Sequence, residues 1–260
     1  MIDAGKPLWT LRFALMTVVV LALIAVTASL GFWQLSRAQE KLARHAEMLG
    51  RETLAPWSEQ ELLRALASDP AIAQTQAFHP LQLRGHWVKG ATLYLDNRQM
   101  KGRPGFYVYT PLRLVGSGAV VAVERGWAPR DFDDRTHLPQ VAEPDGEVAV
   151  VGRVGGEPGR LFEFSPSVTG PGASPIRQNL TVAAYAGEFS LDLLPLTVVQ
   201  TGAASDGLLR DWPAPDSGVD TNYGYAFQWF GLCALVTVLY VWFQIVRRLP
   251  GRRGKTAGRG

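Results

Sequence analysis

The chain has 260 residues, of which 47% are hydrophobic and 19% charged, and its formal net charge is +3. An aromatic content of 10% is too high for a disordered chain, and a single cysteine excludes both a disulfide framework and a cysteine-rich zinc module. The sequence pI of about 9.1 is that of a basic protein, and basic proteins often bind nucleic acid. The positions of the basic residues along the chain decide whether that interpretation applies.

The positive charge is concentrated at the two ends of the chain. Residues 1–12 and 247–260 together hold eight basic residues and one acidic residue, which leaves 18 basic and 22 acidic residues elsewhere. The long central part is therefore slightly acidic. We expect no nucleic-acid partner, and we expect the basic tails to report membrane topology instead.

An uncharged, strongly apolar stretch follows the first tail at residues 13–36. Its 24 residues would form a helix of roughly 36 Å, which is long enough to cross a hydrocarbon core of about 30 Å. Trp9 lies at one end and Phe32 and Trp33 at the other, and aromatic rings favour the membrane interface. The sequence predicts a first transmembrane helix over residues 13–35, after a cytoplasmic tail.

A signal-peptide interpretation of this stretch is the alternative. Val26, Thr27 and Ala28 resemble a small-residue cleavage site after an apolar run. The run continues to Leu35, however, and is then longer than the apolar core of a signal peptide. An uncleaved span is therefore favoured.

Two helical signals follow the first span. Residues 36–49 are rich in helix formers, so the helix of the span is predicted to continue beyond the bilayer. Ser58 and Glu61 have the spacing of a capping box, which predicts a second, short helix. Asp69 is followed by a proline, which cannot continue the helix, so the helix is predicted to end there.

The pattern further along the chain is that of β-structure. Short runs rich in valine and aromatic residues are separated by turns with glycine and proline. The predicted strands cover residues 78–88, 92–95, 105–112, 119–123, 147–151 and 196–200. Strands at this spacing indicate one antiparallel sheet or a small barrel. Loops are expected at residues 155–159, 165–175 and 201–218.

A second uncharged stretch covers residues 221–246 and predicts the second transmembrane helix. Aromatic residues lie near both of its ends, namely Tyr223, Tyr225, Phe227, Trp229, Tyr240, Trp242 and Phe243. Because basic tails adjoin both spans, the positive-inside rule predicts that both termini are cytoplasmic. The predicted fold class is therefore membrane α+β, with N- and C-terminal transmembrane helices flanking a β-rich extracytoplasmic domain at residues 36–220.

A search for reactive groups finds no recognisable catalytic or metal-binding pattern. The single thiol, Cys233, lies in the middle of the second span, where it serves as a small apolar residue. The histidines are His45, His79, His86 and His137, and their spacing matches no metal motif. A binding or assembly protein is favoured, and a membrane-anchored hydrolase with an unrecognised site is the enzymatic alternative.

Two segments are candidates for contact with a partner. Trp33 and Gln34 leave the first span at the membrane face where Tyr225 and Trp229 enter the second, with Arg37 close by in the sequence. Such a groove suits a flat macrocycle or a partner helix, and ordinary interfacial anchoring explains it equally well.

Residues 125–130 end a predicted strand with a glycine, Trp127 and two arginines. A partner surface and a core anchor for Trp127 are both consistent with this pattern.

Several fragments together resemble a known family. They are Gly31-Phe-Trp-Gln-Leu35 with Arg37 and Lys41, then Gly85, Thr110-Pro-Leu112, Val123-Glu-Arg-Gly-Trp-Ala-Pro129 and Tyr225-Ala-Phe-Gln-Trp-Phe230. In this order and in a two-span frame they resemble the Surfeit locus protein 1 family, the cytochrome oxidase assembly factors of bacteria and mitochondria. The matching motif residues are Gly31, Lys41, Gly85, Pro111, Arg125, Gly126, Trp127, Ala226 and Phe230.

The resemblance implies a non-enzymatic assembly factor for a haem–copper terminal oxidase, which aids insertion of haem a into the catalytic subunit. The implied partners are that subunit, the machinery of haem a synthesis or insertion, and the lipid bilayer. The implied location is a bacterial inner membrane, with the central domain in the periplasm.

The resemblance also raises haem a as a cofactor. Some bacterial relatives are thought to bind haem through a histidine just before a Tyr-Ala pair, and here that place holds Asn222. An asparagine amide is a poor axial ligand beside imidazole, so a partner or Tyr223 would have to take its place. A membrane-anchored haem carrier or chaperone is therefore the alternative function. The candidate groove residues are Trp33, Gln34, Arg37, Tyr223, Tyr225 and Trp229.

Overall fold

The computed structural model describes residues 11–131, 138–159, 174–213 and 216–245. The chain divides into two compact units. The first, Met1–His45 with Asp216–Gly260, is called the helical unit below, and the second, Ala46–Pro215, the barrel unit. The basic tail at residues 247–260 and most of the predicted loop at residues 165–175 lie outside the described residues.

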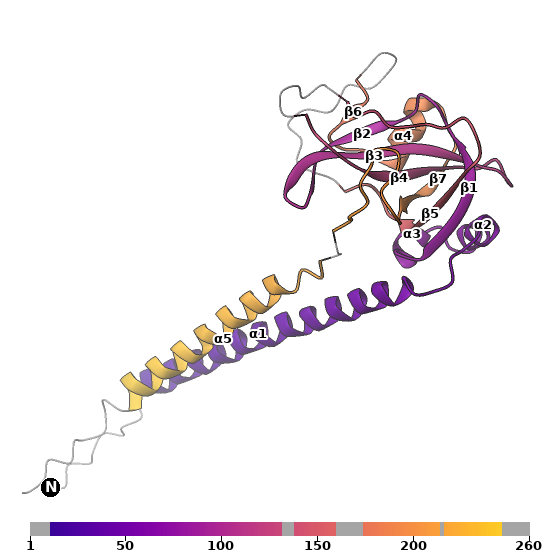
Figure 1. Cartoon of the computed structure of the whole chain (residues 1–260). Helices are drawn as coiled ribbons and strands as arrows, with labels where there is room; N and C mark the ends of the chain where they lie inside the picture. Colours follow the sequence, from indigo (N-terminus) through magenta and orange to yellow (C-terminus); the bar gives the residue numbers. More distant parts are fainter. Residues whose placement is uncertain (1–10, 132–137, 160–173, 214–215, 246–260) are drawn as a thin grey trace, which may run out of the picture. The chain divides into compact units, whose positions relative to one another are not determined.

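Two long helices make up the described part of the helical unit (Figure 1). α1 (Leu11–Arg51) has 41 residues, and α5 (Asp220–Tyr240) has 21 and is followed by a π-helical turn, η1 (Val241–Ile245). Both helices are long and apolar enough to cross a membrane. The chain is therefore a membrane α+β protein. The predicted continuation of the first helix beyond the apolar stretch is confirmed, since α1 runs on to Arg51.

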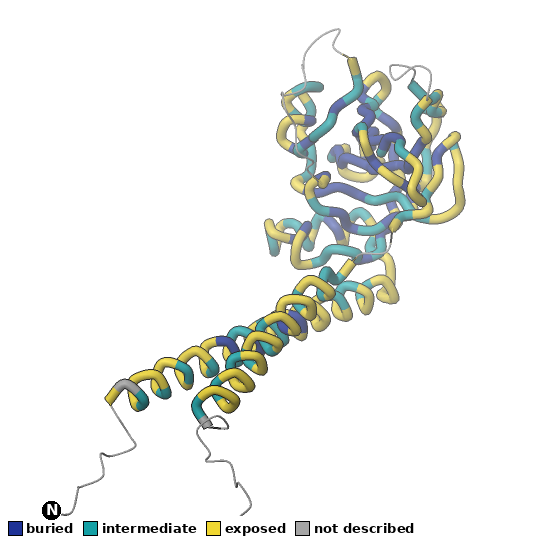
Figure 2. Tube along the Cα trace, turned by 90° about the vertical axis from the view of Figure 1, so that its left-hand side faces the viewer, coloured by how far each residue is buried: buried dark blue, intermediate teal, exposed yellow. Residues whose placement is uncertain are grey.

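The two helices are antiparallel and meet along a seam. The hydroxyl groups of Thr17 and Tyr240 lie 2.8 Å apart, and Sγ of Cys233 lies 3.8 Å from the carbonyl oxygen of Ile24. Small residues allow helices to approach closely in a membrane. Those buried in this helix pair are Thr27, Gly31, Ala38 and Ala226. Most of the remaining helix surface is exposed (Figure 2), including large apolar side chains that suit contact with lipid.

One sheet dominates the barrel unit (Figure 1). Its strands are β1 (Pro80–Trp87), β2 (Leu93–Met100), β3 (Arg103–Leu114), β4 (Val120–Pro129), β5 (Val148–Gly155), β6 (Ile176–Arg177) and β7 (Leu193–Gln200). The strand order is β1-β5-β7-β4-β3-β2-β6, and β1 also pairs with β3. This additional pairing closes β1, β5, β7, β4 and β3 into a five-stranded barrel, which β2 and β6 extend.

Strand pairing in this barrel is mixed. β4 pairs with β7 in parallel, and so does β2 with β6, whereas the other pairs are antiparallel. A parallel pair needs a long crossover, and here β5 and the helix α4 (Val182–Phe189) lie between β4 and β7 in the sequence. The predicted small barrel is confirmed, with parallel pairs added to the expected antiparallel ones.

Buried residues gather in the interior of the barrel unit (Figure 2). β1 alternates between buried and exposed residues, and its Leu81 and Leu83 belong to the main buried cluster of apolar side chains. Leu62 of α2 (Glu59–Ser68) and the first residue of α3 (Ile72–Thr75) belong to the same cluster. The two short helices therefore pack on the barrel core.

Local signals placed most elements correctly. The capping box predicted for α2 is present, because Ser58 and Glu61 bond to each other's backbone amides, and Asp69 is the C-cap. β2 extends beyond its predicted end at residue 95, past a bulge where Asn97 has a φ of 57°. α4 and the two-residue β6 were not predicted. Thr181 caps α4, but the glycine near its C-terminal end weakened the helical signal.

Candidate functional site

A polar cluster joins α1 to the start of α5. Asn222 accepts a hydrogen bond at Oδ1 from Nζ of Lys41 (2.7 Å) and donates from Nδ2 to Oε1 of Gln34 (2.7 Å). The Lys41 ammonium also donates to the carbonyl oxygen of Gly218 (3.1 Å). An ammonium group only donates, so Lys41 fixes which end of the Asn222 amide faces it. We call Gln34, Lys41 and Asn222 the polar clasp.

Next to the polar clasp, the seam is packed around an aromatic ring. The rings of Phe32 and Phe230 meet edge to face, with centroids 5.2 Å apart. A Cβ atom added to Gly31 would lie 2.7 Å from the Phe230 ring, so any larger residue there requires the ring to shift. Ala226 is also buried, at 2% exposure. The motif residues of the two helices therefore build the helix seam.

The other groove residues surround the polar clasp without joining it. Arg37 forms an ion pair with Glu40 on its own helix (2.8 Å). Trp229 is half-buried. The exposed rings are Trp33 (55%), Tyr223 (44%) and Tyr225 (49%). The helical unit thus presents aromatic surface beside the polar clasp, and a groove formed by these rings stays a prediction.

Asn222 does not fit the role of an axial ligand to haem iron. Both polar ends of its amide are engaged, one by Lys41 and one by Gln34. An uncharged amide is also a weak iron ligand compared with imidazole. The helical unit contains one histidine in its sequence, His45 on α1. The residue at the expected ligand position therefore serves the helix pair instead.

In the barrel unit, Arg125 of β4 is a fully buried cation. Its guanidinium lies 4.4 Å from the centroid of the Trp87 ring, donates to the carbonyl oxygen of Ala142 (2.7 Å) and pairs with Asp206 (3.2 Å). A buried charge is stable only with such partners. Arg125 therefore ties the connection that follows β4 and the distant segment around Asp206 to the barrel.

Trp127 is a core anchor. It is 1% exposed, and its Nε1 donates to the carbonyl oxygen of Arg98 (2.9 Å). Its backbone exchanges two hydrogen bonds with Leu209, and a Cβ on Gly126 would lie 2.6 Å from the Cβ of Leu208. Of the two interpretations of residues 125–130, the partner surface is wrong for Trp127, because the segment around residue 208 covers it.

Gly85 and Pro111 lie where the barrel closes. Gly85 of β1 pairs with Val148 on one side and with Leu114 on the other. A Cβ on Gly85 would collide with the carbonyl oxygen of Arg113. The Pro111 carbonyl accepts the backbone N–H that follows β1 (2.9 Å). These motif residues allow β1 and β3 to approach closely.

Comparison with known proteins identifies the family of this chain. A family model described as the SURF1 family matches residues 21–234, which begin inside α1 and end inside α5. The chain belongs to the SURF1 family. This is the Surfeit locus protein 1 family that the motifs resemble, and it is a family of cytochrome oxidase assembly factors rather than of enzymes.

Three relatives in the SURF1 family match along most of their length. Surfeit locus protein 1 of Mus musculus is 30% identical over 258 residues, covering 88% of this chain and 76% of the mouse protein. Surfeit locus protein 1 of Rattus norvegicus is 28% identical over 246 residues, covering 87% and 74%. The SURF1-like protein of Rickettsia bellii is 26% identical over 261 residues, covering 90% and 92%. The similarity therefore extends over both membrane helices and the barrel.

Glu124, inside a SURF1 motif fragment, is a buried carboxyl group that the sequence did not single out. The Tyr109 hydroxyl donates to its Oε2 (2.6 Å). Burial raises the pKa of Glu124 to about 7, against the opposing effects of Tyr109 and of the cations Arg98 and Arg153. The sequence offered one signal for this buried carboxyl group, namely that Glu124 directly follows the apolar run at residues 119–123.

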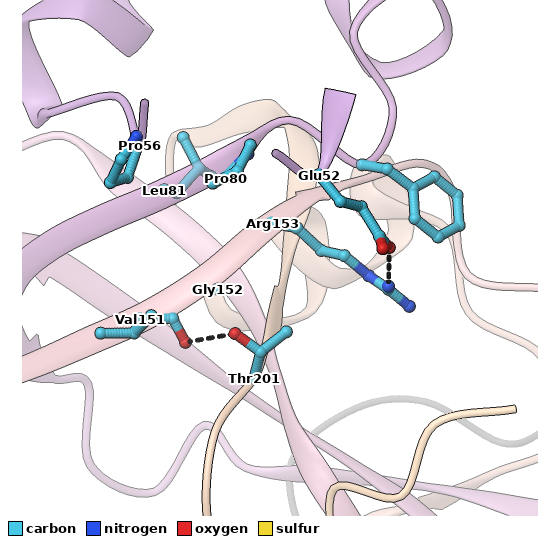
Figure 3. A pocket seen from close by; sticks show the side chains of 9 residues that line it. Glu52, Pro56, Pro80, Leu81, Val151, Gly152, Arg153 and Thr201 are labelled. Atoms are coloured by element: carbon cyan, nitrogen blue, oxygen red, sulfur yellow. Dashed lines mark hydrogen bonds and ion pairs between the residues drawn. The ribbon is translucent and has the colours of Figure 1, made fainter. Parts of the chain in front are cut away.

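A shallow pocket of about 300 Å³ lies on the outside of the barrel (Figure 3). Its lining is mainly apolar, with Thr201 and the ion pair of Glu52 and Arg153 (2.7 Å) as its polar members. The Arg153 guanidinium also lies 4.2 Å from the centroid of the Phe78 ring. The charges are paired with each other, so the pocket presents neither a free base nor a nucleophile among its lining residues.

Two of the histidines, His79 and His86, lie in the described part of the barrel unit. His79 is buried and stacks on Trp57, with ring centroids 3.7 Å apart, and burial lowers its pKa. His86 is exposed on β1, and His137 lies outside the described residues. Among the residues that the structure describes, no group of three or more His, Cys, Asp or Glu side chains is placed to hold a metal ion.

Proposed function

We propose that this chain is an assembly factor for a haem–copper cytochrome oxidase and acts without catalysing a reaction of its own. The observation that carries the proposal is the SURF1 match over residues 21–234, which takes in the barrel and most of both membrane helices. The proposed partner is the catalytic subunit of the oxidase during its maturation.

The finer role that we propose is support of haem a insertion. Trp33, Tyr225 and Trp229 lie on the helices near the polar clasp, and aromatic faces suit a flat macrocycle or a partner helix. Because Asn222 is engaged in the polar clasp, the proposed role is to assist transfer of haem between other proteins rather than to store it.

The proposed topology has both termini in the cytoplasm and the barrel unit in the periplasm of a bacterial cell. The basic tails beside both membrane helices favour it. Alkaline phosphatase fused after residue 213 should be active, and a fusion after residue 260 should be inactive. The opposite pattern would contradict this orientation.

The experiment that tests the function is deletion and complementation. Membranes of the parent organism without this chain should lose cytochrome oxidase activity and regain it when the chain is supplied. Replacement of Tyr225 and Trp229 by alanine should lower oxidase haem content more than the level of the variant itself. Trp242→Ala is the matched control, because Trp242 is an exposed ring beyond the far end of α5 (56%).

Equal loss of haem content and of variant protein would favour membrane anchoring over a groove. Normal oxidase activity and haem content in the deletion strain would contradict the assembly role. A stoichiometric Soret band in the purified chain would favour a haem carrier instead.

A further inference from the structure

The polar clasp connects side chains that are very distant in the sequence. Lys41 and Asn222 are 181 residues apart, and Gln34 and Asn222 are 188 apart. Both bonds join α1 to the first turn of α5. The bond from Lys41 to the Gly218 carbonyl adds a third connection just before α5 begins.

Away from the polar clasp, the seam has directional contacts mainly at its opposite end, where the hydroxyls of Thr17 and Tyr240 lie 2.8 Å apart and Nε2 of Gln244 lies 3.7 Å from Sδ of Met16. Its buried residues are small, and its central polar contact is the weak approach of Cys233 to the Ile24 carbonyl (3.8 Å). Small residues permit close approach but do not by themselves select one register. A slip by one helical turn would move α5 by about 5.4 Å along α1 and would break every bond of the polar clasp.

We propose that the polar clasp sets the register of the two membrane helices, with Asn222 as the positioning residue at its centre. The geometry supports this role, because Asn222 offers one acceptor and one donor and each meets a complementary group at 2.7 Å. The inference goes beyond the oxidase role and does not depend on it. It also gives Asn222 a function in place of iron ligation.

Substitutions at Asn222 separate the bonds from the size of the side chain. Asn222→Leu keeps a similar volume and removes both hydrogen bonds. Asn222→Asp keeps an acceptor for Lys41 and converts that hydrogen bond into an ion pair. Since a hydrogen bond contributes a factor of about three to ten to an equilibrium, Asn222→Leu should reduce the preference for the native register about tenfold.

The native cysteine provides the measurement. Sγ of Cys233 lies 3.8 Å from the Ile24 carbonyl oxygen, so the Ile24→Cys variant places a second thiol on the part of α1 that faces the native one. Ala28→Cys places the second thiol one turn away on α1. Oxidation of intact membranes, followed by alkylation of the remaining free thiols, gives the ratio of cross-linking at position 24 to that at position 28.

In the full-length chain, Asn222→Asp should preserve the ratio measured with the native Asn222. Asn222→Leu should change it about tenfold. Gln228→Leu is the matched control, because it also replaces an amide by leucine on α5 but at an exposed position. A ratio in Asn222→Leu equal to that in Gln228→Leu would overturn the proposal.

Two further outcomes are decisive. If Asn222→Leu does not accumulate, Gln34→Leu and Lys41→Met replace it. Gln34→Leu removes one bond and should change the ratio about threefold, and Lys41→Met removes two bonds and should change it about tenfold. Unchanged ratios in both would overturn the proposal. Membranes from cells that make no haem a should give the same ratio as normal membranes. A native ratio that falls when haem a is absent would show that haem, not the polar clasp, sets the register.

Discussion

Replacing Glu124 by glutamine should remove a pH-dependent loss of stability from the barrel unit. The carboxyl group is buried beside the Tyr109 hydroxyl, and its burial raises its pKa to about 7 from an ordinary value of 4.5. The folded barrel therefore binds this proton more tightly than the unfolded chain does. Stability from this group is fully present below about pH 4.5 and is lost as the pH rises towards 7.

The size of the effect follows from the difference between the two pKa values. Each unit corresponds to ~1.4 kcal/mol, so ionisation of Glu124 should lower the free energy of unfolding by about 3 kcal/mol between pH 4.5 and 8. Glutamine keeps an oxygen that can accept the Tyr109 hydrogen bond and does not ionise. Glu124→Gln should therefore lack this decrease.

The assay is urea unfolding of the full-length chain in detergent at pH 5, 6, 7 and 8. Tryptophan fluorescence reports on the barrel unit, which contains Trp57, Trp87, Trp127 and Trp212. Glu147→Gln is the control, because the Glu147 side chain is 45% exposed on the same unit. The reasoning is refuted if Glu124→Gln shows the same decrease in stability with pH as the native chain.

Three further substitutions test packing. In the Ile24→Cys background, Gly31→Leu should weaken the helix pair and lower cross-linking to the native Cys233. Adding Phe230→Ala should partly restore the cross-linking, and no restoration would exclude the Phe230 ring as the cause. Gly85→Ala should prevent accumulation of the folded chain, whereas Gly146→Ala, with nothing within 4 Å of its added Cβ, should not; equal levels in membranes would contradict the closure argument. Trp127→Ala should lower the free energy of unfolding by about 3–5 kcal/mol in urea titrations, and a change below about 1 kcal/mol would contradict its role in the core.

Features set by neighbouring residues were predictable. The lengths of the two uncharged stretches are enough to identify the membrane helices. The capping box of Ser58 and Glu61 placed α2, and β-branched runs placed the start of each predicted strand within three residues. The predicted ends of β2, β4 and β5 were wrong, because these strands continue for four to six further residues. The motif fragments also identified the family correctly.

Features that depend on distant contacts were not predictable. Asn222 was singled out for a missing imidazole, and only the folded helix pair shows that Gln34 and Lys41 engage its amide. Trp127 was compatible with a surface or a core position until the segment at Leu209 was seen to pair with it. The parallel pairing of β4 with β7 likewise depends on a crossover that no local pattern specifies.

The central claim is that this chain assists maturation of the oxidase catalytic subunit. The most direct measurement is the ratio of haem a to catalytic subunit in membranes from a strain lacking the chain, compared with the complemented strain. The account predicts a lower ratio in the deletion strain and its full return on complementation. An unchanged ratio, with the subunit present and active in the deletion strain, would contradict it.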